Sequence, residues 1–118
     1  MQKKKLQFID VADTGEFAAA AFNNAKNFDH KIIELAGDEL TIEEMVAKIS
    51  RITKKTIKVE HVTEEEAIAD GMIWPYANYQ EWTNQVGYSV DINALKSFGI
   101  PLTSFTQFLE KNRNKLPL

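Results

Sequence analysis

The triplet Asp13-Thr14-Gly15 is the first place in the sequence where the residue types could do chemistry. Aspartic proteases carry a catalytic aspartate in such a triplet, and a glycine directly after a strand also occurs where nucleotide phosphates bind. The context fits neither site, because an alanine-rich run follows Glu16 and no second copy of the triplet exists. Asp13 stands three residues before Glu16, which is the spacing of a helix capping box. We therefore predict that Asp13 caps a helix.

The glycines are too scattered for a nucleotide-binding loop. A dinucleotide fingerprint needs clustered glycines after a strand, because the backbone must approach the pyrophosphate closely at a helix N-terminus. The five glycines of this chain are Gly15, Gly37, Gly71, Gly87 and Gly99. We predict no cofactor-binding residues within the chain.

The histidines and acidic residues offer no catalytic or metal centre at a recognisable spacing. His30 and His61 are the only histidines, and the run from Glu64 to Glu66 is expected to be the first turn of a helix. The chain has no cysteine, which excludes disulfides and thiolate metal sites and favours the cytoplasm as its compartment. We predict neither a catalytic residue nor a metal ligand, and no activity of the chain alone.

The segment from residue 72 to 88 contains all the tryptophans and tyrosines of the chain. Aromatic residues at this density pack in a core, form a seam between subunits or line a ligand site. All three possibilities stay open here. If the segment binds a ligand, the candidate substrate-binding residues are Trp74, Tyr76, Tyr79 and Trp82. They cannot all lie on one face of a helix, so some are expected to be exposed or to contact another segment.

The first half of the chain alternates strand-like and helix-like patterns. Residues 6–11, 31–37 and 56–62 have the apolar, β-branched character of strands, and an alanine-rich helix separates the first two. That order predicts a β-α-β unit with a right-handed crossover. We therefore predict an α/β fold with a small, partly parallel sheet of about three strands, followed by an α-helical, aromatic-rich C-terminal part.

Helix starts are marked by capping residues. On the first helix, Phe17 and Phe22 are expected to share the buried face. A helix over about residues 75–86 would carry Pro75 in its first turn. The other predicted caps are Thr41, Thr63, Asp91 and Thr103.

Composition indicates one soluble domain over residues 1–118. Hydrophobic residues make up 44% of the chain and charged residues 26%, which are ordinary values for a globular protein. The net charge of −3 gives no general attraction to nucleic acid, so we predict no nucleic-acid partner. No apolar run approaches the length of a membrane helix, so we predict no membrane association either.

Several segments, taken in order, resemble the C-terminal part of NmrA-like proteins, an atypical branch of the short-chain dehydrogenase/reductase superfamily. They are FIDVADTGEFAAAAF, KIIELAGDELTIEEMVAKISRIT, IKVEHV and GYSVDINALKSFGIPLTSFTQFLEKN. The family motifs fall on residues 10–15, 33–41 and 87–99. Each motif is loose, but their order and spacing together are fairly specific.

The resemblance implies that a full-length relative binds NAD(P) and acts as a quinone-type or related reductase, or as a redox-sensing regulator. It also implies that this chain begins after the N-terminal Rossmann half, so the chain would be catalytically incomplete and would itself hold no cofactor. On this basis we expect a substrate-side domain that takes a small-molecule substrate. The alternative is a stand-alone protein-interaction or oligomerisation module without small-molecule chemistry. Because a Rossmann half would normally cover one apolar face, we also expect a homo-oligomer.

Overall fold

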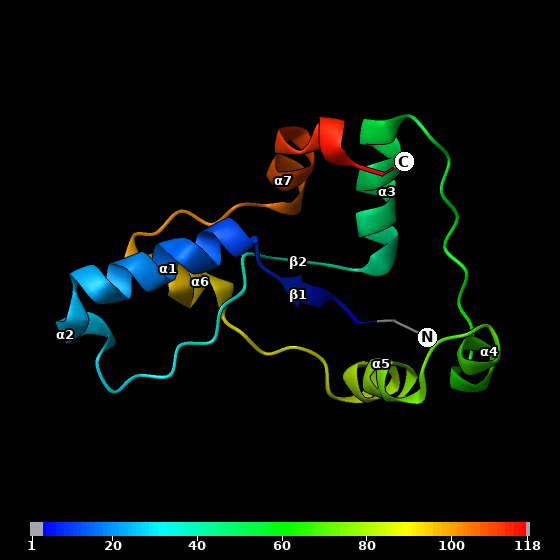
Figure 1. The fold of residues 1–118 in the computed structure, drawn as a ribbon, viewed down its shortest axis with the longest axis horizontal. Coiled ribbons are helices and arrows are strands. Elements are labelled where there is room, and N and C mark those ends of the chain that lie inside the picture. Colours follow the sequence, from blue (N-terminus) through cyan, green and yellow to red (C-terminus); the bar gives the residue numbers. More distant parts are fainter. Residues whose placement is uncertain (1–3, 118) are drawn as a thin grey trace. The chain divides into compact units, whose positions relative to one another are not determined.

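A computed structural model describes residues 4–117 of the protein, and this part of the chain is mostly helical (Figure 1). The contacts between residues divide this part of the chain into two compact units. Unit 1 comprises residues 4–6, 40–89 and 117, and unit 2 comprises residues 7–39 and 90–116. The single domain expected from composition stays a prediction.

The sheet differs from the predicted one. It has two short strands, β1 (Leu6–Phe8) and β2 (Asp38–Leu40), which pair in antiparallel fashion. Residues 31–37 and 56–62 form no strand. The predicted α/β fold with a partly parallel sheet of about three strands and a β-α-β unit is therefore wrong.

The physical reason for this error is that strand formation needs a neighbour. The run 31–37 has the right composition, but β propensity reflects packing against adjacent strands more than an intrinsic preference. Ile32 is almost fully exposed, and residues 31–36 pair with no strand in the part of the chain that the structure describes. The N–H of Gly37 donates to the carbonyl of Phe8 at 2.7 Å, and the pairing continues past the predicted strand into β2.

Unit 2 is built from helices around a group of phenylalanines. The ring of Phe98 lies 6.0 Å from that of Phe17, edge-on, and 5.3 Å from that of Phe28, stacked. Phe8 and Phe105 form a second edge-on pair at 5.4 Å. The helical elements are α1 (Val11–Asn23), α2 (Ala25–Phe28), α6 (Ile92–Leu95), η1 (Lys96–Phe98), α7 (Phe105–Lys111) and η2 (Arg113–Lys115).

Asp13 does not cap α1, so that prediction is wrong. The cap is Asp10, whose side chain accepts from the N–H of Ala12 at 2.9 Å. Asp13 is buried in the first turn, where its two carboxylate oxygens accept from Thr103: from the N–H at 2.6 Å and from the hydroxyl at 3.0 Å. Thr103 in turn does not cap the last helix, because Ser104 does so in a reciprocal box with Gln107. The two residues predicted as caps instead bind one another.

The two phenylalanines predicted to share a face of α1 have different environments. Phe17 is 4% exposed and Phe22 is 90% exposed. The buried stripe of α1 therefore runs from Asp13 to Phe17 and does not reach Phe22.

Unit 1 contains α3 (Ile42–Thr53), α4 (Glu64–Ala69) and α5 (Trp74–Val86). The predicted caps Thr41 and Thr63 are confirmed, since their hydroxyls accept from backbone N–H groups three residues later at 3.2 and 3.1 Å. Pro75 lies in the first turn of α5 as predicted. In unit 2 the cap Asp91 is confirmed at the start of α6. None of the helices in residues 4–117 is long and apolar enough to cross a bilayer.

Candidate functional site

The four aromatic residues predicted to bind substrate all lie on α5 (Figure 1). The exposed fractions are 61% for Trp74, 66% for Tyr76, 52% for Tyr79 and 53% for Trp82. The structure therefore places none of them in the core. It brings two of the rings together, since those of Tyr79 and Trp82 lie 6.1 Å apart and are tilted by 31°.

Helix α5 has a proline in its first turn and a glycine at its C-cap, and these residues define its two ends. Proline favours the first turn of a helix, where its missing N–H is not needed. At the other end Gly87 has a φ of 75°, and its N–H donates to the carbonyl of Thr83 at 2.7 Å. A β-carbon at Gly87 would approach the flexible side chain of Lys4 to 3.1 Å, so the positive φ, more than the space, favours glycine at this position. The amine of Lys4 donates to the carbonyl of Gln85 at 2.9 Å.

Helix α5 exposes its large apolar side chains, whereas an ordinary surface helix buries them. Such a helix turns its apolar stripe toward the core. In α5 the buried residues are Ala77 and Thr83, and the hydroxyl of Thr83 donates to the carbonyl of Tyr79 at 2.8 Å. Tyr79, Trp82 and Val86 are spaced by three and four residues, so they form one stripe, and each is more than half exposed. We call these three residues the α5 stripe.

Tyr88 follows α5 in the chain, and its side chain interacts with that of Tyr79 in the α5 stripe. Burial raises the pKa of Tyr88, and a hydrogen bond with Tyr79 raises it further. The phenol therefore stays neutral over the physiological range. The Tyr88 hydroxyl thus adds a polar group beside α5 without adding charge.

The whole aromatic surface is almost free of charge. Within α5 the only charged residue is Glu81, which is partly buried. Exposed helix faces of soluble proteins normally carry several charges. The surface thus resembles the desolvated centre of an interface or binding site more than an ordinary solvated face.

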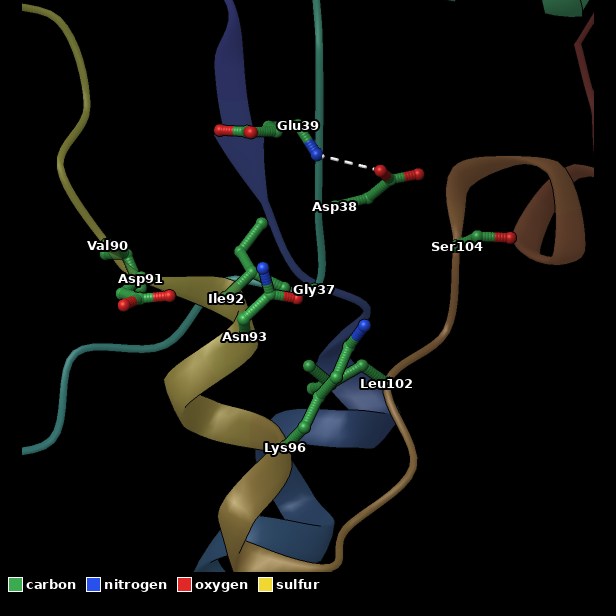
Figure 2. Close-up of a pocket in the computed structure, with 10 residues that line it drawn as sticks. All are labelled: Gly37, Asp38, Glu39, Val90, Asp91, Ile92, Asn93, Lys96, Leu102 and Ser104. Atoms are coloured by element: carbon green, nitrogen blue, oxygen red, sulfur yellow. Dashed lines mark hydrogen bonds between the residues drawn. The ribbon is translucent and has the colours of Figure 1, made fainter.

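A second candidate site is a pocket of about 450 Å³ in unit 2 (Figure 2). It is lined by residues 37–39 and 90–93 together with Lys96, Leu102 and Ser104. Its volume lies in the range of small-molecule sites. The sequence did not indicate this pocket, since its lining comes from two segments more than 50 residues apart.

The walls of the pocket are joined by a side chain that the sequence analysis missed. The amide nitrogen of Gln7 donates to the carbonyl of Val90 at 2.7 Å, and the N–H of Val90 donates back to the amide oxygen of Gln7 at 3.0 Å. The same amide nitrogen donates to Glu39 at 3.2 Å. Glutamine has no local signature for such pairing, so no sequence signal could have found it.

The carboxylates of the pocket are largely occupied by the backbone. Asp38 accepts from the N–H groups of Glu39 and Phe105, both at 2.8 Å, and the first of these bonds is drawn in Figure 2. Asp91 accepts from the N–H of Ala94 at the start of α6. Asp38 and Asp91 therefore hold the backbone of the pocket in place, and Glu39, Lys96 and Ser104 are the other side chains in its lining that carry a charge or a hydroxyl. Among residues 4–117 no group of three His, Asp or Glu side chains could hold a metal ion.

The histidines lie outside both sites. His30 is exposed beside Asp29 at 3.6 Å. His61 contacts Glu43 on α3, with Nε2 2.7 Å from Oε1, although the sequence showed no acidic partner near it. This pair is in unit 1 and both side chains are substantially exposed.

The pair gives unit 1 a pH dependence. A hydrogen bond from its own backbone and a second from His61 lower the pKa of Glu43. A carboxyl with a depressed folded-state pKa stabilises the fold above its unfolded pKa of about 4.3, and that stability is lost as the pH falls through the folded-state pKa. We expect Glu43→Gln to lower the melting temperature slightly at pH 6 and to have a smaller effect at pH 3, because protonation weakens the contribution of the carboxylate. Thermal denaturation at both pH values measures this.

The control for that measurement is Glu65→Gln, which removes an exposed carboxylate from α4. The interpretation fails if Glu43→Gln changes the melting temperature equally at pH 6 and pH 3, because the ionised carboxylate would then have no part in it.

Comparison with known proteins identifies one family. The model of the NmrA-like family matches residues 1–110, which is nearly the whole sequence. No curated protein matches the chain.

Proposed function

The chain belongs to the NmrA-like family of the atypical short-chain dehydrogenase/reductase superfamily, and from this premise we propose that it is the substrate-side domain of an NAD(P)-dependent oxidoreductase or redox-sensing regulator. The family is one of NAD(P)-associated oxidoreductases and regulators. The observation that carries the proposal is the exposed, uncharged aromatic surface of α5, formed by Trp74, Tyr76, Tyr79 and Trp82.

The chemistry of this surface suits a neutral, planar substrate. Aromatic side chains stack on conjugated rings, and such stacking contributes about 1 to 3 kcal/mol per ring. The tyrosine hydroxyls can donate to a carbonyl oxygen of the same substrate. A quinone-type compound has both features and carries no charge that would call for an ion-pair partner.

In this proposal the hydride donor is supplied from outside the chain. The five glycines are far apart in the sequence and form no phosphate-binding loop. The residues of α5 would bind and orient the substrate, and a nicotinamide cofactor, when bound outside this chain, would supply the hydride.

Substrate binding is tested with a soluble benzoquinone, 2,3-dimethoxy-5-methyl-1,4-benzoquinone, as the probe. Both tryptophans of the chain lie on α5, so their fluorescence reports this surface directly. We expect saturable quenching, and at least about fivefold weaker binding after Trp74→Leu, the equivalent of 1 kcal/mol of stacking. The chain has no cysteine, so the quinone cannot add to a thiol.

The matched control is Phe22→Leu, which removes an exposed aromatic ring from unit 2. This variant should bind the quinone as the parent does. Linear, non-saturating quenching, or equal loss of binding in both variants, would contradict a substrate site on α5.

Cofactor binding is tested separately by titrating the chain with NADPH and following the cofactor's fluorescence. We expect no saturable binding at micromolar concentrations. Micromolar affinity would refute the proposal that the cofactor is held outside this chain, whatever the outcome with the quinone.

A second candidate function is a protein-interaction or oligomerisation module without small-molecule chemistry. The outward-facing α5 stripe favours it, because monomeric proteins rarely expose large contiguous apolar patches. Absence of quinone binding together with self-association of the chain would select this function over the first.

A further inference from the structure

We propose that the pocket of unit 2 binds a small aliphatic α-amino acid in its zwitterionic form. All the residues that line this pocket belong to unit 2. The inference is independent of the proposed function, whose substrate surface is on α5 in unit 1. It rests on three features of the lining, which are unpaired charges of both signs, an apolar side and walls that are tied together by hydrogen bonds.

The lining carries one ammonium group, that of Lys96 on η1, together with three carboxylates. Among residues 4–117 the Lys96 amine forms no ion pair, although the carboxylates belong to the same pocket. Figure 2 shows this amine well separated from the carboxylates of Asp91 and Glu39. The pocket therefore offers a positive and a negative partner at separate places.

Two of the three carboxylates keep one oxygen available for a ligand. Asp91 uses Oδ1 to accept from the N–H of Ala94 at 3.1 Å, and Glu39 uses Oε2 to accept from the amide of Gln7 at 3.2 Å. Within the part of the chain that the structure describes, no hydrogen bond or ion pair engages the other oxygen of either side chain. Asp38 differs, because both of its oxygens accept from backbone N–H groups. The acidic partners for a ligand are therefore Glu39 and Asp91.

This distribution of charge favours a zwitterion over a ligand with a single charge. A ligand that carried only a carboxylate would be repelled by three carboxylates, and one that carried only an ammonium group would be repelled by Lys96. A zwitterion places its carboxylate on Lys96 and its ammonium group on Glu39 or Asp91, so each charge meets its complement. A metal ion is a poorer fit, since no three acidic side chains among residues 4–117 converge enough to hold one.

The apolar part of the lining indicates the side chain of the ligand. Val90, Ile92 and Leu102 are half-buried and aliphatic, and none of the residues that line the pocket is aromatic. Burial of methyl and methylene groups against such side chains is favourable, whereas a ring would find no partner for stacking. The volume of about 450 Å³ is in the range of small-molecule sites. An aliphatic amino acid such as leucine has all the complementary groups.

The walls of the pocket are joined before any ligand binds. Gln7 forms two hydrogen bonds with the backbone of Val90 and a third with Glu39. Asp38 accepts from the N–H of Phe105 at 2.8 Å, which ties the β2 side of the pocket to the start of α7. A site that is already assembled costs less conformational entropy on binding.

The first experiment titrates the isotopically labelled full chain with L-leucine and follows the backbone amide signals by nuclear magnetic resonance. We expect saturable shifts of the residues that line the pocket, with an affinity in the millimolar range. Two probes with the same carbon skeleton each lack one charge: 4-methylpentanoate lacks the ammonium group and 3-methylbutylamine lacks the carboxylate. Each should bind at least about fivefold more weakly than leucine, because one ion pair is lost.

The second experiment removes one charge of the pocket at a time. Lys96→Gln should weaken leucine binding about fivefold and make 3-methylbutylamine the better ligand relative to leucine. Asp91→Asn keeps a side chain that caps α6 and should shift the preference toward 4-methylpentanoate. A residue that only supported the fold would not reverse the preference between the two probes. Lys26→Gln is the control, since Lys26 is exposed on α2 of the same unit outside the lining, and it should bind leucine as the parent does.

Circular dichroism checks that each variant is folded, and Glu39→Gln provides a second way to remove an acidic partner if Asp91→Asn loses helicity. Three results would overturn the proposal. The first is the absence of saturable shifts with leucine at tens of millimolar. The second is equal affinity for leucine and for either probe with a single charge, and the third is an unchanged preference between the probes in the folded variants.

Discussion

Replacing Phe17 by Ala is expected to lower the free energy of unfolding by about 3 kcal/mol or more. Phe17 is nearly fully buried, and its ring packs edge-on against Phe98 at 6.0 Å. Removal of the ring loses its transfer free energy and leaves a cavity where α1 meets η1. A domain of this size has a total stability of about 5–15 kcal/mol, so the substitution would remove a large part of it.

Phe22→Ala is the matched control for that substitution, because it removes the same ring from the same helix at a position that is 90% exposed. It should change stability by no more than about 0.5 kcal/mol. Urea denaturation followed by far-ultraviolet circular dichroism is the suitable measurement, since both tryptophans lie in unit 1 and would not report unit 2. Equal costs for the two variants would contradict the placement of α1.

Replacing Asp13 by Ala is expected to cost about 2 to 3 kcal/mol of unfolding free energy. Hydrogen bonds to a charged group are stronger than neutral ones, and the carboxylate accepts two of them from Thr103. Its loss leaves the N–H of Thr103 without its acceptor in a partly buried place. The connection between α1 and the segment before α7 would be lost with it.

Two variants separate this contact from a general effect of removing an acid. Thr103→Val removes the hydroxyl and keeps the N–H, so it should cost less than Asp13→Ala, and the two effects should not add. Asp29→Ala removes an exposed carboxylate and should be close to neutral. Simple additivity of Asp13→Ala and Thr103→Val would show that the two residues do not interact.

The parts of the fold that follow from short-range sequence were predicted correctly. Thr41, Thr63 and Asp91 cap helices as expected, because a cap depends on a side chain and a backbone group only three residues apart. Pro75 lies in the first turn of α5 for the same kind of local reason. The family was also recognised from the order of its motifs, and the family match over residues 1–110 confirms it.

The errors concern groups whose partners are distant in the chain. Asp13 has the spacing of a cap, but its partner Thr103 is 90 residues away. The run 31–37 has the composition of a strand, but a strand exists only where a neighbour pairs with it. In both places the local sequence pattern favoured one structure, and contacts with residues distant in the chain determined a different one.

In the candidate site, too, some features follow from the local sequence and others only from distant contacts. The sequence by itself determined that residues 72–88 hold all the tryptophans and tyrosines, and that Pro75 lies in the first turn of a helix. Only the tertiary structure decided which side of α5 faces inward, because that depends on the packing of Ala77 and Thr83 against the rest of unit 1. Tertiary contacts likewise joined Gln7 to Val90, 83 residues apart, to close the pocket of unit 2. Helix caps and composition are set by neighbours along the chain, whereas exposure and pairing depend on folding free energy summed over distant contacts.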